Sequence, residues 1–185
     1  TCMFCITGEY FQPSGLETWD VSAVVSMSDM FTGQERYWPH MYLTAFNANL
    51  SAWNVSSVEN MDRMFAGAAN FNVNIRNWNV ERVTSMHKMF RGATSFNVNI
   101  RNWNVERVTN MENMFEGATS FNVNIGNWNV ERVTNMENMF KGATSFAADI
   151  SGWTPASNAK VSNMFMNAPD WLNLYTNCGF DKSDT

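Results

Sequence analysis

The stretch NWNVERVTNMENMFEGATSF, residues 102–121, decides the fold, because nearly the same sequence occurs one repeat earlier and one repeat later. Tryptophan gives the period, since five tryptophans lie 25 residues apart: Trp53, Trp78, Trp103, Trp128 and Trp153. Trp19 precedes Trp53 by 34 residues, so the first repeat carries nine additional residues. A repeat of this length predicts coils that stack and bury their apolar sides against one another.

The apolar residues keep fixed places within each repeat. In one copy they are Trp103, Val105, Val108, Met111, Met114, Phe115, Ala118, Phe121 and Ile125. Stacking would align each of them with its own copy in the next coil and close a continuous core. We therefore expect the methionines of these positions to be core residues and not a binding surface, although Met-rich surfaces can bind partners promiscuously.

Local patterns predict one short helix of about two turns in each coil. Val108, Met111, Met114 and Phe115 have helical spacing, Thr109 with Glu112 and Thr134 with Glu137 match capping boxes, and Gly117 and Gly142 suit helix ends. The segment FNVNIGNWNV, residues 121–130, alternates apolar and polar residues and predicts one or two short strands. Stacked coils would pair these strands into a parallel sheet.

The overall composition narrows the class of protein. The chain has 185 residues, is 45% hydrophobic and 16% charged, and carries a formal net charge of −5. It is too apolar for a disordered chain, and its twelve basic residues are not clustered, which argues against a nucleic-acid partner. No apolar run is long enough to span a bilayer. Because the chain begins at Thr1, we expect it to be a processed or truncated product.

The three cysteines, Cys2, Cys5 and Cys178, are too few for a disulfide scaffold. The C-x-x-C spacing of Cys2 and Cys5 lacks a second ligand pair for zinc, which leaves a disulfide between them open.

We predict three parts: residues 1–18 as an N-terminal cap, residues 19–170 as the repeats with an insertion at 34–43, and residues 171–185 as a C-terminal cap and tail.

The pattern W-x-V-x-x-V-T-x-M-x-x-M-F-x-G-A-x-x-F-N, clearest in VTNMENMFEGATSF, resembles the repeat of the BspA-like leucine-rich-repeat surface proteins, in the Met- and Phe-rich version of mycoplasma-type lipoproteins. The resemblance implies a right-handed α/β solenoid related to leucine-rich repeats. With the six tryptophan anchors and the local patterns, we therefore expect about six coils, each with a short helix and a short parallel strand. The resemblance also implies secretion or surface display, and adhesion or protein binding.

No set of residues predicts catalysis, and we expect no enzyme, cofactor or metal site. His87 stands where later coils have Glu112 and Glu137, so we expect a solvated helix residue. Glu81, Glu106 and Glu131 are each followed by arginine, which predicts opposite-charge ladders on a wet surface. The asparagines, such as Asn97, Asn99, Asn102 and Asn104, fit either a polar binding face or ladders that satisfy backbone groups.

Partner binding is expected where the coils differ. One column holds Arg76 and Arg101 but Gly126, and another holds Arg91, Glu116 and Lys141. The insertion gathers interface-prone residues, namely Arg36, Tyr37, Trp38, His40 and Tyr42, which could instead fold back onto the first coil. Two N-x-S sequons, at Asn49 and Asn54, could carry glycan on a eukaryotic secretory route.

Together these features predict a non-enzymatic interaction or adhesion module, secreted or at the cell surface, that binds a protein or glycan. The alternative is a structural or accessory subunit of a larger assembly, for example in an organelle lumen.

Overall fold

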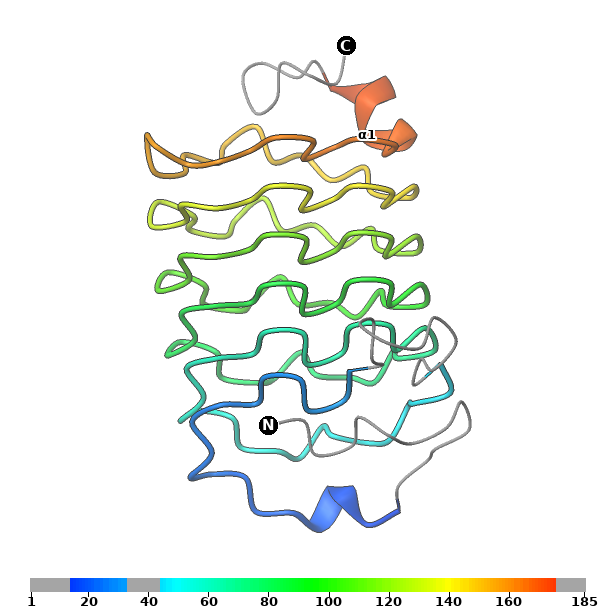
Figure 1. Cartoon of the computed structure of the whole chain (residues 1–185), viewed down its shortest axis with the longest axis vertical. Coiled ribbons are helices and arrows are strands. Elements are labelled where there is room, and N and C mark those ends of the chain that lie inside the picture. Colours follow the sequence, from blue (N-terminus) through cyan, green and yellow to red (C-terminus); the bar gives the residue numbers. More distant parts are fainter. Residues whose placement is uncertain (1–13, 33–43, 176–185) are drawn as a thin grey trace.

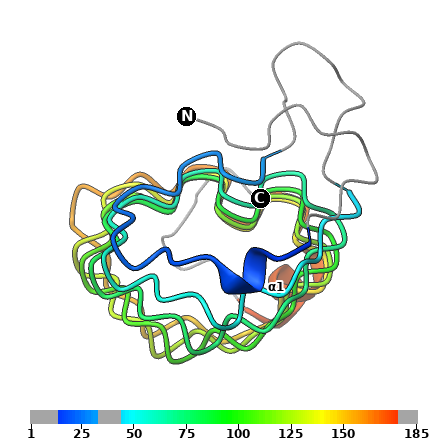
Figure 2. The same cartoon turned by 90° about the horizontal axis from the view of Figure 1, so that it is seen from below.

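The computed structural model describes residues 14–32 and 44–175, and these ranges form successive coils stacked along one axis (Figure 1). Viewed along that axis, the coils follow a common outline (Figure 2). Only two regular elements occur in the described ranges: η1, a 3-10 helix over Leu16–Thr18, and α1, an α-helix over Pro169–Leu174. They lie in the first and last coils, so the coils between them are built from turns.

Single parallel bridges join the coils where a sheet was expected. The bridged residues are Ser26, Asn60, Ser85, Asn110, Asn135 and Lys160, each paired with the next in this order. No longer strand occurs in the described ranges. Between the bridges, asparagine side chains shape the turns: Asn124 Oδ1 accepts the Gly126 N–H at 3.1 Å. The predicted parallel sheet was wrong because such turns interrupt the segment at residues 121–130 and leave no extended run.

The predicted helix within each coil was also wrong, and the backbone shows why. Asn113 and Gly117 both have left-handed φ angles, 56° and 70°, which an α-helix does not accommodate. Alternate N–H groups therefore point in different directions. The Met114 N–H donates within the coil, to Met111 O at 3.2 Å, whereas the Asn113 N–H donates to Glu137 O in the next coil at 2.9 Å. The result is a chain of tight turns in which every second N–H joins two coils.

The expected capping boxes are absent from these turns. Thr109 Oγ1 donates to Thr84 O in the preceding coil at 3.2 Å, and Thr134 Oγ1 donates to Thr109 O at 3.1 Å. The Glu112 N–H instead donates to Asn110 Oδ1 at 3.0 Å. The threonines thus join coils and start no helix. The expected class, an α/β leucine-rich-repeat-like solenoid of helix–strand coils, is therefore overturned, and the molecule is a stack of turns joined by ladders.

Two columns of phenylalanine fill the core. Phe115 stacks on Phe121 of its own coil with ring centroids 3.9 Å apart, and on Phe90 and Phe140 of the neighbouring coils at 5.7 Å. These rings are fully buried, and each contributes about 1.5–3 kcal/mol through burial. The methionines of the repeat are buried beside them, as expected for core residues; they are Met27, Met30, Met61, Met64, Met86, Met89, Met111, Met114, Met136, Met139 and Met164.

The columns continue into both end coils. Phe31 stacks on Phe46 with ring centroids 4.3 Å apart, although residues 33–43 separate the two in the sequence. In the last coil Trp171 of α1 takes the second phenylalanine's place and stacks on Phe165 at 3.6 Å. Pro169 begins α1 at a position that needs no N–H partner. The aromatic core therefore runs from the first described coil to α1.

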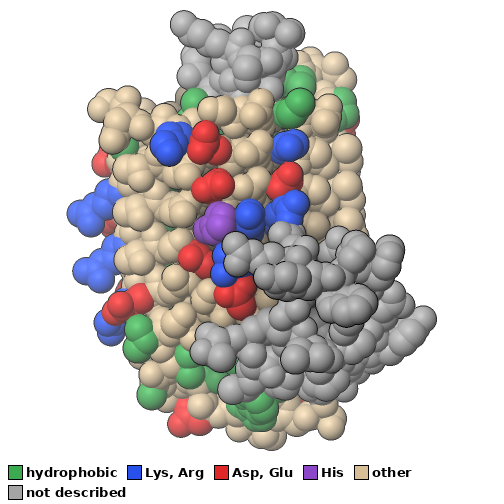
Figure 3. Space-filling view, viewed as in Figure 1, with side chains coloured by type: hydrophobic (Ala, Val, Ile, Leu, Met, Phe, Trp, Pro, Cys, Tyr) green, Lys and Arg blue, Asp and Glu red, His purple; other side chains and the backbone are tan. Residues whose placement is uncertain are grey.

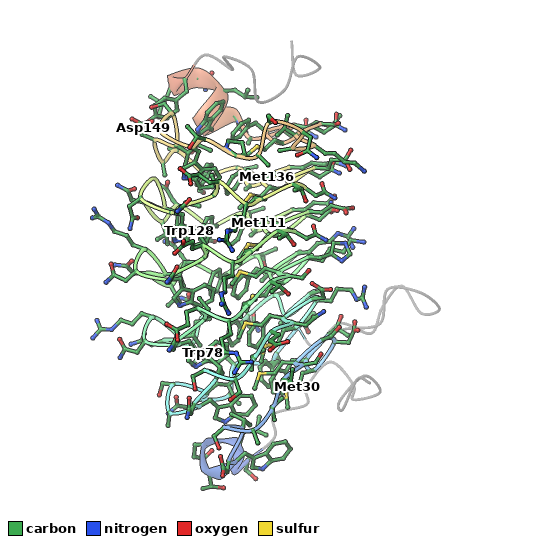
Figure 4. The ribbon with its side chains drawn as sticks, turned by 90° about the vertical axis from the view of Figure 1, so that its left-hand side faces the viewer. Met30, Trp78, Met111, Trp128, Met136 and Asp149 are labelled. Atoms are coloured by element: carbon green, nitrogen blue, oxygen red, sulfur yellow. The ribbon has the colours of Figure 1, made fainter. Side chains whose placement is uncertain are left out.

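Each repeated tryptophan joins its coil to the one before. The Trp103 indole N–H donates to Ile75 O at 3.3 Å, and Trp128 donates to Ile100 O at the same distance. Figure 4 shows Trp78 and Trp128 in one column, with Met111 and Met136 nearer the opposite side. The tryptophans thus fix the register between coils as well as filling the core.

Candidate partner-binding surface

The column of Arg91, Glu116 and Lys141 was expected to bind a partner, and its side chains are partly buried. Arg91 Nε lies 2.6 Å from Glu116 Oε2, and Lys141 Nζ lies 3.6 Å from Glu116 Oε1. Asn113 Nδ2 also donates to Glu116 Oε2, at 2.7 Å. Acidic and basic side chains gather along this face of the molecule (Figure 3). Glu116 therefore connects three coils, and the charged groups of this column are engaged in holding the coils together.

A neighbouring column on the same turns contains Asp62, His87 and Glu112. The His87 N–H donates to Asp62 Oδ1 at 3.0 Å, and His87 Nε2 lies 4.0 Å from Glu112 Oε1. Burial lowers the pKa of His87 below its ordinary value, the charges of Lys88 and Arg63 lower it further, and Glu112 and Asp62 oppose the change. His87 was expected to be a solvated helix residue, but it is half-buried in a turn. Within residues 14–32 and 44–175, no three His, Cys, Asp or Glu side chains are placed to hold a metal ion.

A bidentate ion pair joins the first two coils near this column. Arg63 Nε lies 2.5 Å from Asp29 Oδ1, and Arg63 Nη2 lies 2.7 Å from Asp29 Oδ2. Burial raises the pKa of Asp29, but hydrogen bonds from Arg63 and Ser28 and the charge of Arg63 more than compensate and lower it. This pair fastens the first coil to the repeats that follow.

The predicted ladder of Glu81, Glu106 and Glu131 with the arginines that follow them does not form in the described ranges, where the one pair that these arginines make uses Glu59 instead. Arg82 Nη2 lies 2.6 Å from Glu59 Oε1, whereas the matching arginines Arg107 and Arg132 have no ion pair within the part of the chain that the structure describes. Those two arginines line a shallow hollow with Glu81 and Glu106. The reason is visible in the sequence, since Thr84 stands one coil after Glu59 and offers no charge.

Of the four asparagines singled out in the sequence, Asn97, Asn99 and Asn104 accept backbone N–H groups through their oxygens, whereas Asn102 accepts none from a described residue. Asn97 Oδ1 accepts the Asn122 N–H of the next coil at 2.9 Å. Asn99 and Asn104 accept N–H groups two residues ahead, from Arg101 and Glu106, both at 3.1 Å. These contacts confirm that asparagine ladders satisfy backbone groups. They also orient each amide, because an N–H donor must face the oxygen and not the NH₂ group.

The column of Arg76, Arg101 and Gly126 differs from the paired column around Glu116, because its charged side chains remain unpaired among the described residues. Arg76 and Arg101 are exposed, and Arg76 lines a shallow hollow with Asn77, Asn99 and Asn102. Neither arginine has an ion pair to any residue in the described ranges. Sequence reasoning did not single out Asn77, although its place one coil before Asn102 was a usable signal. The hollow therefore combines unpaired cationic charge with amide groups.

Of the other predicted sites, the structure describes the two glycosylation sequons but not the cysteines or the insertion. Asn49 and Asn54 are both exposed, and their Oδ1 atoms accept the N–H groups of Ser51 and Ser56 at 3.1 and 3.2 Å. Outside the described residues lie Cys2, Cys5 and Cys178, the insertion residues Arg36, Tyr37, Trp38, His40 and Tyr42, and most of both predicted caps. No helix in the described ranges is both long and apolar enough to cross a bilayer.

The ladders and the repeated core define the chain as a repeat protein of stacked turns. It belongs to the family described as "Mycoplasma protein of unknown function, DUF285", which matches residues 2–116 and 98–177. This match covers nearly the whole chain and bears out the coarser part of the sequence resemblance. No curated protein and no solved structure showed significant similarity to the chain.

Proposed function

We propose that the chain is a non-enzymatic interaction or adhesion module, displayed outside the cell, which binds a partner through the exposed sides of its central coils. The observation that carries the proposal is a division of roles among the side chains. Core and ladder groups are engaged in stacking, whereas one exposed column changes from arginine at Arg76 and Arg101 to glycine at Gly126. Variation on a constant frame is how repeat proteins commonly present binding surfaces.

The repeat sequence gives the proposal its second support. The Met- and Phe-rich pattern resembles that of BspA-like surface proteins, for which adhesion is the implied role. Two of the acidic side chains are engaged in the stack: Glu116 bridges coils, and Asp62 accepts the backbone N–H of His87. Their geometry suits a rigid scaffold.

Binding of the purified chain to cell surfaces and to extracellular matrix tests this function. The chain is labelled at its terminus and titrated onto intact cells and immobilised matrix, and saturable binding is expected. The control is the same chain unfolded in urea and diluted just before the assay. Absence of saturable binding to every surface would contradict an adhesion role. Recovery of the native chain only within a large, fixed assembly would favour the accessory-subunit alternative.

A further inference from the structure

The hollow beside Arg76 is unusual in its hydrogen-bonding character. Its lining residues are Arg76, Asn77, Asn99 and Asn102, with no carboxylate among them. Arginine offers five N–H donors and no acceptor. Asn99 Oδ1 already accepts the Arg101 N–H at 3.1 Å, whereas the Asn99 NH₂ group makes no hydrogen bond to a described residue and is left to donate to a partner. The hollow therefore offers mostly donors, together with a positive charge.

Asn77 and Asn102 add a second property. Neither side chain makes a hydrogen bond to any residue in the described ranges. Each can therefore rotate to offer both a donor and an acceptor, which is the combination that a hydroxyl group requires. An anion and neighbouring hydroxyls on one partner would satisfy the hollow completely.

Arg101 stands one coil beyond Arg76 in the same column and is also exposed. Two guanidinium groups on successive coils suit a chain with repeated anionic groups, since each can form paired hydrogen bonds to a carboxylate or sulfate. The pair of arginines is followed in this column by Gly126, where an added Cβ would lie 2.4 Å from Asp149 O, and then by Ser151. The backbone at Gly126 leaves no room for a side chain, so the pair of arginines is confined to two coils.

The central coils also lack the features of a protein interface. The exposed large apolar residues in the described part of the chain are Trp19, Val25, Met166 and Leu174, all in the first or last coil. Protein interfaces depend on buried aromatic and apolar anchors. A polar, hydroxyl-rich partner needs none.

From these observations we propose that the surface formed by Arg76, Asn77, Asn99, Arg101 and Asn102 binds an acidic polysaccharide. The two arginines hold its anionic groups, and the asparagines hold its hydroxyls. The proposal rests on the interaction function above and names the class of partner. The net charge of −5 does not oppose it, because charges beyond the Debye length of about 8 Å are largely screened at physiological salt.

The binding experiment uses the whole chain with four polymers: hyaluronan, which carries carboxylates, heparin, which also carries sulfates, neutral dextran, and poly-glutamate. We expect saturable, salt-sensitive binding of hyaluronan or heparin, and much weaker binding of dextran and poly-glutamate. Which acidic polymer binds better identifies the anionic group. Equal binding of poly-glutamate would overturn the polysaccharide assignment in favour of an acidic peptide, and equal binding of dextran would overturn the role of charge.

Two matched double variants locate the site. Arg76→Gln with Arg101→Gln is expected to weaken binding about tenfold or more, because charge-assisted hydrogen bonds are lost. Arg107→Gln with Arg132→Gln removes the same charge from a different column and is expected to change affinity by less than about threefold. Equal losses would show that the assigned surface is wrong.

A third variant, Asn102→Asp, replaces an amide by an isosteric carboxylate and is expected to weaken binding without affecting the fold. Unchanged affinity in Asn102→Asp would remove the asparagines from the site. Saturable cell binding that neither acidic polysaccharide inhibits would leave the adhesion function standing and defeat this inference alone.

Discussion

The exposed asparagines of the repeat are of two kinds, those whose side chain bonds to the backbone and those whose side chain has no such partner within the described ranges. Asn97 Oδ1 accepts a hydrogen bond from the Asn122 N–H of the next coil at 2.9 Å, whereas the Asn102 side chain makes no hydrogen bond to a described residue. Both are exposed, so exposure alone does not distinguish them. What separates them is whether a backbone N–H lies within reach of the side-chain oxygen.

Replacing these two residues by alanine measures that difference. Asn97→Ala should lower the free energy of unfolding by about 1 kcal/mol, because one hydrogen bond between coils is lost. Asn102→Ala should change it by less than about 0.5 kcal/mol, as is usual for a surface side chain without partners. Urea denaturation of both variants provides the comparison, and equal losses would refute the distinction.

His87 makes stability depend on pH in a direction that the pKa fixes. Its pKa is lowered in the folded chain by burial and then by Lys88. As the pH falls through about 6.5, the unfolded chain therefore takes up a proton that the folded chain resists, and the folded state loses stability. We expect His87→Gln to reduce the loss of stability between neutral and mildly acidic pH. The measurement is the urea midpoint of the unsubstituted chain and of His87→Gln as a function of pH. If the two midpoints fell in parallel as the pH is lowered, His87 would have no such effect.

At the scale of one coil, the left-handed residues decide the conformation. Arg63, Lys88, Asn113, Asn138 and Asn163 all have φ between 54° and 57°, at one shared position. Gly117 and Gly142 are recognisable in the sequence as left-handed positions, but such glycines are also typical of helix ends. Nothing in the residue type of Arg63 or Lys88 signals a left-handed backbone, which is why the helix was predicted.

The sequence did contain the register, the core and the place of the repeated tryptophans. The repeat length and the order of the apolar residues can be read from the sequence, and stacking brings each apolar residue against its own copy in the next coil. The direction of each N–H is not such a property, because it depends on the next coil lying within hydrogen-bond distance. The ion pairs of Glu116 and the hollow beside Arg76 likewise appear only after the coils are stacked.

Gly126 offers a test at this scale, with Arg101 as its counterpart one coil earlier. Gly126→Ser should destabilise the fold by about 1–3 kcal/mol, since the new Cβ would lie 2.4 Å from Asp149 O and force a backbone shift. Arg101→Ser, at the matching position, should be nearly neutral. Thermal or urea unfolding of the two variants distinguishes them, and a neutral Gly126→Ser would mean that the neighbouring turn yields easily.

For the whole molecule, contacts are made mainly between neighbouring coils. Such an architecture gains stability roughly in proportion to the number of coils and their shared surfaces. Each ladder repeats at 25 residues, from the bridges of Ser85 and Asn110 to the asparagine contacts. The register and not the exact length should therefore determine whether the chain folds.

Two deletions examine this expectation. Removing residues 101–125 joins Ile100 to Gly126 in register, so the shortened chain should fold, with a lower urea midpoint and a smaller dependence on denaturant. Removing residues 102–125, one residue fewer, misaligns every ladder at the junction and should destroy cooperative unfolding. Hydrogen exchange followed by NMR reports both results, and equal protection in the two proteins would contradict the role of register.

The aligned tryptophans have an optical consequence. The rings of Trp128 and Trp153 are buried and stacked with centroids 6.4 Å apart, and aromatic rings held in one fixed packing should give a near-ultraviolet dichroic signal. The far-ultraviolet spectrum should look like that of an unfolded chain, because regular helix in the described ranges is confined to η1 and α1. A spectroscopist who recorded only the second spectrum would mistake a densely packed protein for a disordered one.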